Sequence, residues 1–400
     1  MGQPLLRRQP FKGLYLAYFV FSTLLVRVPL WFIWFLPRSN RPRATWSIMR
    51  CIRVMNLRML MGLPIKLGLK SSRDIPKSDD ELKNAKFVWI EGLSEDSEAF
   101  CGEVRKAAAI AGVKPARIPA YWFSKPGSLV LKDLKAKAGE RTVLHIHGGA
   151  FHLGSAHPDA TTANIAHGLL AHSEKLERIL AVDYRLAATH PDPPANPFPA
   201  AVLDCIAAYQ YLVKEAGFEP QNVTVAGDSA GGNLAFALVR HLVENAIPGL
   251  PPPGGLLSLS SWLDLSSSRK SDPEASLVRN SATDIFPTSP TSQFGGYGVH
   301  AYLGPLNLEE AKTNRYISPS SPHLSSMEGL FKGFPRTFVS AGGAEKILDD
   351  STVVAERLKA DGVDVLVDVA PDSVHDFMVF TWHEPERTNA LKRICKWLDQ

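Results

Sequence analysis

The sequence predicts an α/β fold with a mostly parallel central sheet and helices on both of its faces. Two observations support this expectation. From about residue 116 onward, short apolar runs alternate with stretches of helical length, an order that is typical of βαβ units with a buried parallel sheet. The chain also has 400 residues, of which 45% are hydrophobic and 21% charged, and this is enough for one large domain or two modest ones with an ample core.

Six apolar runs are expected to be strands, and helical stretches lie between them. The strand candidates are residues 142–146, 179–183, 223–226, 256–259, 337–340 and 365–369. Two of the helix candidates are residues 199–215 and 230–245. In the second, Leu234, Leu238 and Leu242 are four residues apart, which is the spacing of one face of a helix.

The regions outside this alternation suggest how the chain is divided. Residues 267–334 are rich in Ser, Pro, Gly and Asn and show no clear strand, so we expect a cap or lid inserted over the sheet. Residues 41–115 look mostly helical and are expected to form a linker and further cap helices. The α/β domain then covers residues 116–400, and residues 1–40 form an N-terminal segment of a different kind.

The segment 14–36 is apolar enough to be a membrane anchor. Its 23 residues, at about 1.5 Å per residue, match a bilayer core of about 30 Å. Arg27 and Pro29 lie inside it and oppose insertion, because a charge near the centre costs about 2.5–3.5 kcal/mol and proline lacks a backbone donor. Trp31 and Trp34 suit one membrane interface.

Three alternatives to a spanning anchor are a cleaved signal peptide, a helix lying on the membrane surface and a buried core helix. No small-residue cleavage site follows the apolar run, which disfavours cleavage. We expect residues 1–40 to be a single-pass anchor with basic flanks, placed in the membrane of the endoplasmic reticulum. Basic residues flank the segment on both sides and leave the orientation of the body open, with the larger number after the segment favouring the cytosolic side by the positive-inside tendency. The sequence leaves the oligomeric state open.

The charge distribution argues against nucleic acid as a partner. Residues 1–70 contain twelve Lys and Arg and no Asp or Glu, which leaves 32 basic and 40 acidic residues in the rest of the chain. A nucleic-acid-binding domain needs a basic face on the folded body, and here the basic character belongs to the N-terminus. The spacing of Cys and His residues also suggests no metal site.

Ser229 lies in the hexapeptide Gly-Asp-Ser-Ala-Gly-Gly, between a predicted strand and a predicted helix. This is the context of a nucleophile elbow, in which a sharp turn presents the serine hydroxyl at the start of a helix. Gly227 and Gly231 allow the sharp turn. The backbone N–H groups at the helix start favour a developing oxyanion.

A nucleophilic serine needs further oxyanion donors and two partners. The segment His-Gly-Gly-Ala-Phe at 147–151 follows the strand 142–146, and we expect the N–H groups of Gly148, Gly149 and Ala230 to form a three-donor oxyanion hole.

His375 follows the last predicted strand and is the expected general base, and Glu345 follows the strand 337–340 and is the expected acid. Asp349 and Asp350 are rivals of Glu345. Three other histidines are set aside, His241 as lying on a helix surface and His145 and His147 as structural.

Six motifs together resemble a known family. They are HGGAF at 147–151, VDYRLA at 182–187, PFPAA at 197–201, GDSAGGN at 227–233, SSWLD at 260–264 and VHDF at 374–377. The chain resembles the hormone-sensitive-lipase-like esterases of the α/β-hydrolase fold over residues 116–400, and the serine–acid–histidine order agrees with that fold. Within the family it is most similar to the membrane-anchored steryl acetyl hydrolases of fungi and to arylacetamide deacetylases.

The resemblance implies a serine carboxylic-ester hydrolase with a helical cap and no cofactor. Its substrate would be a lipophilic ester, such as an acetylated sterol, a terpenoid or another secondary metabolite, cleaved through an acyl-enzyme on Ser229. Transesterification on the same residues and a non-catalytic small-molecule receptor are the alternatives.

Some positions differ from the family pattern or carry no chemistry in it. Ala150 stands where many members have a third glycine, 191–196 is an insertion, and Glu345 stands where aspartate is commoner. Three further family positions are expected to be structural members of ion pairs, namely Asp183, Arg185 and Asp264.

Overall fold

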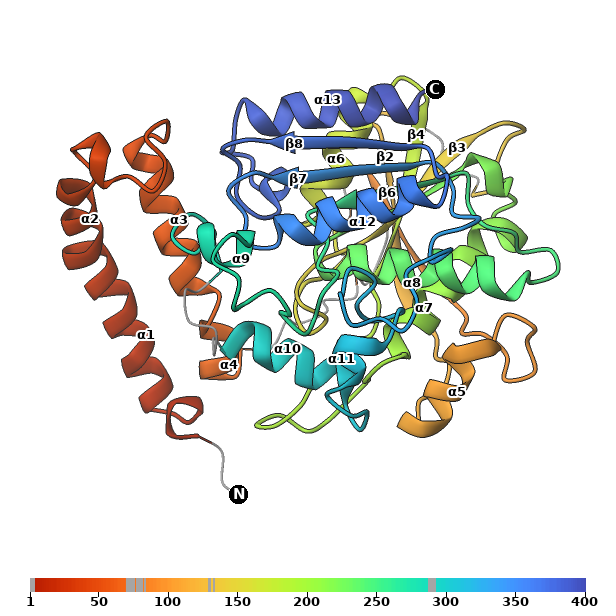
Figure 1. The fold of residues 1–400 in the computed structure, drawn as a ribbon, viewed down its shortest axis with the longest axis horizontal. Coiled ribbons are helices and arrows are strands. Elements are labelled where there is room, and N and C mark those ends of the chain that lie inside the picture. The colour runs from red at the N-terminus through yellow and green to blue at the C-terminus, as the bar shows by residue number, and fades with distance from the viewer. Residues whose placement is uncertain are drawn as a thin grey trace.

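The computed structural model describes residues 4–69, 84–128, 134–286 and 293–400, together with residues 76, 82 and 131. In this part of the chain eight strands form one sheet (Figure 1). They are β1 (Ala85–Ile90), β2 (Ile118–Ser124), β3 (Arg141–Ile146), β4 (Leu176–Val182), β5 (Val223–Asp228), β6 (Gly255–Leu259), β7 (Thr337–Gly342) and β8 (Val365–Ala370). Their order across the sheet is β1-β2-β4-β3-β5-β6-β7-β8.

The sheet is parallel from β4 to β8, and β2 is antiparallel to both of its neighbours. All six strands expected from the sequence are present. The sequence analysis missed β1 and β2. Strand β1 lies within the range 41–115 that was expected to hold only a linker and cap helices, so the sheet begins before residue 116.

Thirteen α-helices lie in the described residues and cover both faces of the sheet. They are α1 (Phe11–Ser22), α2 (Val28–Trp34), α3 (Ile48–Leu60), α4 (Leu63–Leu67), α5 (Gly102–Ala111), α6 (Ala163–His172), α7 (Ala200–Gln210), α8 (Ala230–Asn245), α9 (Ser276–Arg279), α10 (Gln293–Leu303), α11 (Glu310–Thr313), α12 (Leu348–Ala360) and α13 (Glu386–Leu398). The bounds of α8 are those expected from the sequence. Helices α9, α10 and α11 lie in the region 267–334, where a cap was expected.

Alternate residues of the central strands pack into two cores. In β4, Leu180 and Val182 belong to the core shared with α7 and α8, whereas Ile179 and Ala181 belong to the core shared with α6 and α13. Because both faces of the strands are buried, the strands read as continuous apolar runs.

The burial of α8 corrects one expectation from the sequence. His241 was expected on a helix surface, but it is fully buried, and a ring nitrogen, Nε2, lies 2.9 Å from the carbonyl oxygen of Ala99. Helix α8 packs against β5 and β6 on one side and α5 and α7 on another, which leaves it no free face at this position.

Residues Phe11–Trp34 form one long helical segment, because a π-helical turn at Thr23–Arg27 joins α1 to α2. Its mean hydropathy is 1.8 and only 11% of its most apolar window is buried, so by length and composition it is able to cross a membrane. Pro29 lies just after the wide π turn, which is a common way for a helix to absorb an irregularity. The Arg27 guanidinium lies over the rings of Tyr18 and Phe19.

One side of this segment packs on α3 and α4 (Figure 1, red). Phe19 of α1 is buried against Leu63 and Leu67 of α4, and α2 contacts α3. Arg7 adds an ion pair of 2.8 Å with Asp192. The rest of the segment is exposed, and Leu25 for example is 72% exposed. The segment is therefore tied to the folded body along one stripe and presents apolar side chains along the others.

The residues after α2 connect the N-terminal segment to two loops at the carboxyl edge of the sheet. The Arg43 guanidinium donates to the carbonyl oxygen of Gly343 at 3.0 Å, and the Trp46 indole donates to that of Asp372 at 2.9 Å. Trp46 is fully buried and shares a core with Val374 and Phe377.

Trp46 is expected to be one of the larger single contributors to stability in this region. Trp46→Ala should lower the free energy of unfolding by about 3–5 kcal/mol. Trp46→Phe, which keeps an aromatic ring but loses the hydrogen bond, should cost about 1–2 kcal/mol. Denaturant unfolding of the two variants in detergent solution measures both values. Equal losses for the two variants, or no loss for alanine, would contradict the packing described for Trp46.

Candidate active site

Ser229 lies at the turn between β5 and α8, with φ 51° and ψ −118°. Positive φ is rare for a residue with a side chain and marks stored strain. The turn is this tight because two glycines allow close approach: a Cβ on Gly227 would overlap the carbonyl oxygen of Gly231, and a Cβ on Gly231 would overlap that of Ile146. The local sequence therefore forces the serine side chain out of the turn.

The structure brings Ser229, His375 and Glu345 together. The Nε2 atom of His375 lies 2.9 Å from the Ser229 hydroxyl, and its Nδ1 atom lies 3.3 Å from Oε2 of Glu345. All three side chains are buried. Each follows a different strand of the parallel sheet, β5, β7 and β8, so their meeting at one edge is a consequence of the topology.

The two rival acids have other partners. Asp349 accepts a hydrogen bond from the backbone N–H of Ser276 at 2.8 Å. Asp350 accepts two, from the N–H groups of Leu263 and Asp264, both at 2.8 Å. These carboxylates hold the cap and the loop after β6, and Glu345 is the acid that faces the histidine.

The buried charges shift the ionisation of the two partners. Burial lowers the pKa of His375, but the carboxylates of Asp376 and Glu345 outweigh it and leave that pKa well above its usual range. Burial also raises the pKa of Glu345, against the opposing effect of its hydrogen bond to His375. The imidazolium form of His375 is therefore strongly stabilised in this site.

One expected oxyanion donor is already occupied. The N–H of Gly148 donates to Oδ2 of Asp228 at 2.8 Å, so the expectation that Gly148 is a free donor is wrong. The N–H groups of Gly149, Ala150 and Ala230 have no acceptor among the described residues. We infer that these three are the donors. Ala150 was noted in the sequence only as a departure from the family pattern.

Asp228 fixes the loop that carries these donors. Besides the N–H of Gly148, its carboxylate faces Nε2 of His145 at 3.0 Å. The ring of His147 stacks on Tyr184, with centroids 4.3 Å apart, and the Tyr184 hydroxyl donates to the carbonyl oxygen of His147. Both histidines thus have the structural place expected for them.

Asp284 is a site residue that the sequence analysis missed. It lies in the cap, is fully buried, and accepts hydrogen bonds from the backbone N–H of His375 at 3.1 Å and of Lys346 at 2.7 Å. One carboxylate thus links the histidine loop to the acid loop. No motif marked it, because its partners are backbone groups that are distant in sequence.

The three residues expected in ion pairs have structural partners. Arg185 pairs with Asp204 at 2.8 Å, and Asp183 accepts from the N–H of Ala156 at 3.0 Å. Asp264 accepts from the N–H groups of Ser266 and Ser268. None of them contacts Ser229 or His375 in the described contacts.

Apolar side chains from the N-terminal region and the cap cover the site. Ile65 of α4 is buried against Ala150 of the oxyanion loop, and this cluster also includes Met61, Leu153, Trp262, Phe286 and Tyr297. The ring of Phe286 lies 4.5 Å from that of His375. We call these seven residues the roof. Among the described residues, no group of three or more His, Cys, Asp or Glu is arranged to hold a metal ion.

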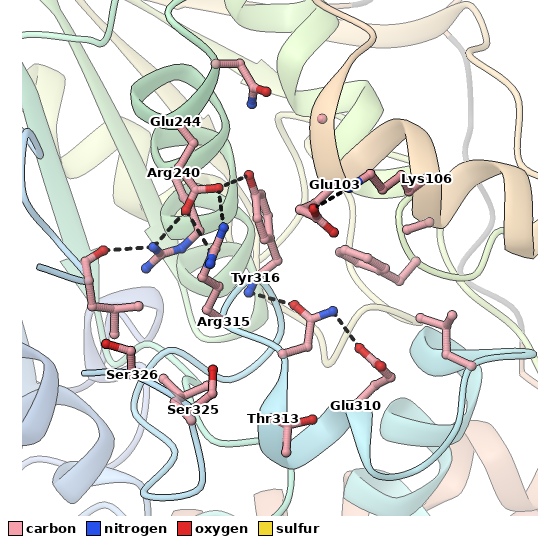
Figure 2. Close-up of a pocket in the computed structure, with 18 of the residues that line it drawn as sticks. Glu103, Lys106, Arg240, Glu244, Glu310, Thr313, Arg315, Tyr316, Ser325 and Ser326 are labelled. Atoms are coloured by element: carbon pink, nitrogen blue, oxygen red, sulfur yellow. Dashed lines mark hydrogen bonds and ion pairs between the residues drawn. The ribbon is translucent and has the colours of Figure 1, made fainter. Parts of the chain in front are cut away.

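A cavity of about 950 Å³ lies away from this chemistry, between α5, α8, α11 and the segment 314–330. Figure 2 shows its charges converging on Glu244, which accepts from Arg240, Arg315 and Tyr316. The Nε and second Nη atoms of Arg240 have no hydrogen-bond acceptor among the described residues but are shielded from solvent, and its guanidinium faces aromatic rings. The cavity therefore offers no free cation of α8 to a ligand, and we assign it no part in the chemistry.

Comparisons with known proteins agree on one family. The family described as alpha/beta hydrolase fold matches residues 143–379, a range that includes Ser229, Glu345 and His375. Esterase LipU of Mycobacterium tuberculosis is 32% identical over 270 residues, covering 66% of this chain and 80% of LipU. An acetyl-hydrolase of Streptomyces hygroscopicus is 30% identical, covering 62% of this chain and 71% of its own length.

The crystal structure of a hormone-sensitive lipase from a metagenome library superposes with a TM-score of 0.54 at 31% identity, covering 70% of this chain and 81% of that one.

The role of Glu345 can be separated from that of its rivals. Glu345→Gln keeps the shape but removes the charge that stabilises the imidazolium, so kcat for a p-nitrophenyl ester should fall by about 10³–10⁴-fold. Asp350→Asn should instead lower the melting temperature and keep most of kcat, because Asp350 bonds backbone groups. If Glu345→Gln keeps more than about a tenth of the wild-type kcat while Asp350→Asn loses most of its kcat, the acid is misassigned.

Proposed function

The chain belongs to the alpha/beta hydrolase family of hormone-sensitive-lipase-like esterases, and we propose that it cleaves lipophilic carboxylic esters through an acyl-enzyme on Ser229. One observation carries the proposal: the Ser229 hydroxyl lies 2.9 Å from Nε2 of His375 at a strained turn that opens α8. A buried serine paired with a histidine, whose other nitrogen faces a carboxylate, is the arrangement of an activated nucleophile.

In the first half of the reaction, Ser229 Oγ attacks the ester carbonyl carbon while its proton passes to Nε2 of His375. The carbonyl oxygen becomes an oxyanion. It is held by the N–H groups of Gly149 and Ala150 in the loop after β3 and by that of Ala230 at the start of α8. Such donors contribute about 10²–10³-fold each. The C–O bond to the alcohol then breaks, and Nε2 returns its proton to the departing alkoxide oxygen.

In the second half, water takes the place of the alcohol. His375 Nε2 accepts one water proton as the hydroxide oxygen attacks the acyl carbon. The tetrahedral intermediate collapses, the bond to Ser229 Oγ breaks, and Nε2 returns the proton to Oγ. Glu345 stays ionised throughout and stabilises each imidazolium.

The roof supports a lipophilic substrate. Its side chains beside His375 and Ala150 are almost all apolar, so burying a hydrocarbon group there gains about 25 cal/mol per Å² removed from water. A related protein is named an acetyl-hydrolase, which supports short acyl groups. We therefore propose acetyl esters of bulky apolar alcohols, such as sterols, terpenoids or other secondary metabolites, as in the fungal steryl acetyl hydrolases that the sequence resembles.

Membrane attachment through Phe11–Trp34 is part of the proposal. The exposed apolar side chains of this segment and its length support a single-pass anchor, and its packing on α4 keeps the body close to the lipid. We propose the membrane of the endoplasmic reticulum as its location. A lipophilic ester dissolved in that bilayer would be close to the roof.

The proposed reaction is tested with a panel of acetyl to octanoyl esters, of p-nitrophenol and of a sterol, in detergent. We expect turnover of the wild type, highest for short acyl chains, and a loss of about 10⁴-fold or more for Ser229→Ala. A missing hydroxyl leaves the fold intact, so melting temperatures should agree. A folded wild type that turns over no ester of any length, or equal rates in both proteins, contradicts the proposal.

The same panel, repeated with an added alcohol, separates hydrolysis from transesterification. Hydrolysis predicts the free acid as the main product. A dominant new ester would assign the second step to an alcohol, and recovery of a tightly bound ester unchanged would favour a receptor.

Membrane attachment is tested on the exposed side of the anchor segment. Phe21→Asp with Leu25→Asp places two charges on positions that make little packing contact, at a cost of about 2.5–3.5 kcal/mol each near a bilayer centre. We expect this variant to move from the membrane pellet to the soluble fraction with its esterase activity retained. The matched control, Ile110→Asp with Leu308→Asp on exposed positions of the body, should not move. Equal partitioning of wild type and Phe21/Leu25 variant would count against the anchor.

A further inference from the structure

The carboxylate of Asp376 is the second one that contacts the ring of His375, and it lies at the nitrogen that also faces the Ser229 hydroxyl. Its Oδ2 atom lies 3.2 Å from Nε2, the atom that is also 2.9 Å from the Ser229 hydroxyl. Its other oxygen, Oδ1, is buried and has no hydrogen-bond partner among the described residues. The imidazole therefore has Glu345 at Nδ1 and Asp376 at Nε2.

The backbone holds Asp376 in this position. Its φ is 51° and ψ 35°, in the left-handed region. Its N–H donates to the Ser260 hydroxyl at 3.2 Å. The turn and this hydrogen bond fix the backbone from which the Asp376 side chain reaches Nε2 of His375.

A carboxylate at Nε2 has a different effect from one at Nδ1. When His375 acts as a base, Nε2 presents a lone pair, which an ionised carboxylate repels. When Nε2 carries a proton, the same carboxylate attracts it and accepts a hydrogen bond. Asp376 therefore opposes the free-base form of His375 and stabilises the imidazolium that exists in each tetrahedral intermediate.

The other charges near this pair are mostly negative. Asp284 accepts from the N–H of His375, Glu345 faces Nδ1, and Asp228 acts on Asp376. The cations Arg58 of α3 and Lys346 of the loop after β7 act on Asp284. Burial raises the pKa of Asp376, and the neighbouring His375 opposes that rise.

We propose that Asp376 is a positioning residue that holds a proton on Nε2 of His375, and so sets the lower pH limit of catalysis. The role rests on the serine mechanism proposed above. In the acylation step the proton from Ser229 Oγ is held on Nε2 beside Oδ2 of Asp376 until the leaving oxygen takes it. At low pH a proton from solvent occupies the same place, and His375 can no longer accept one from Ser229.

The sign of the pH effect follows from the charge. Activity needs His375 as the free base, so kcat/KM falls as pH drops through the range where Nε2 becomes protonated. The negative charge of Asp376 favours protonation and moves that fall to higher pH. Removing the charge should move the fall to lower pH.

Two substitutions test this without disturbing the turn. Asp376→Asn and Asp376→Gly both suit a left-handed backbone. We expect the acid limb of kcat/KM for a p-nitrophenyl ester to move down by about one pH unit or more in both, and the high-pH plateau to fall by no more than about tenfold. The matched control is Asp372→Asn, a half-buried acid of the same loop with no hydrogen bond or ion pair to the His375 ring among the described residues, whose limb should stay within about 0.3 unit of wild type because the effect of a charge falls with its distance from the titrating group.

The pH dependence of acylation by a fluorophosphonate, which does not need the second half-reaction, gives an independent reading of the same limb. The proposal is overturned if Asp376→Asn folds but its acid limb lies at the same pH as that of the wild type. It is also overturned if the folded variant is not labelled at any pH. An equal shift in Asp372→Asn also overturns it, since the effect would then be one of general charge. If the wild type itself is never labelled, the serine mechanism fails instead.

Discussion

The tight turn at Ser229 is the constraint on which the rest of the site depends. Its positive φ is tolerable only because Gly227 and Gly231 let the backbone of β5, α8 and the β3 loop approach within van der Waals contact. Residues held in such conformations persist when their surroundings over-determine them. Here the surroundings are the parallel pairing of β3, β5 and β6 and the carboxylate of Asp228, which fastens the oxyanion loop to the same turn. The same packing therefore positions Ser229, the proposed nucleophile, and the loop that carries the proposed oxyanion donors.

The other half of the site is positioned from outside the sheet. Asp284 of the cap joins the histidine loop to the acid loop, and Arg58 of α3 donates to the carbonyl oxygen of Asp284 at 2.9 Å. Arg43 and Trp46 reach the same two loops from the chain that follows the anchor segment. The N-terminal region thus has a structural part in the site as well as its proposed contact with lipid. Residues of α1, the roof and His375 are thus linked through α4 and Phe286.

Local signals in the sequence were sufficient for the features whose causes are local. The apolar runs predicted the central strands because those strands are buried on both faces, and the glycines around Ser229 predicted the turn. Strands β1 and β2 were missed because β1 is a half-buried edge strand and β2 contains Pro119. Gly148 was misjudged because its N–H is taken by Asp228, a residue 80 positions away, and His241 because α8 has no free face at that position. Asp284 and Asp376 carry no motif, and only the folded chain shows what they face.

We propose that Ser229 is an activated nucleophile in a site assembled by the native fold. The most direct measurement is labelling with a fluorophosphonate probe, in membrane and soluble fractions, for the wild type and Ser229→Ala, with the modified peptide identified by mass. The account predicts a single adduct on Ser229, in the membrane fraction, that is absent from the variant and from the heat-unfolded wild type. A folded wild type that is not labelled, or one labelled equally after Ser229→Ala, would contradict it.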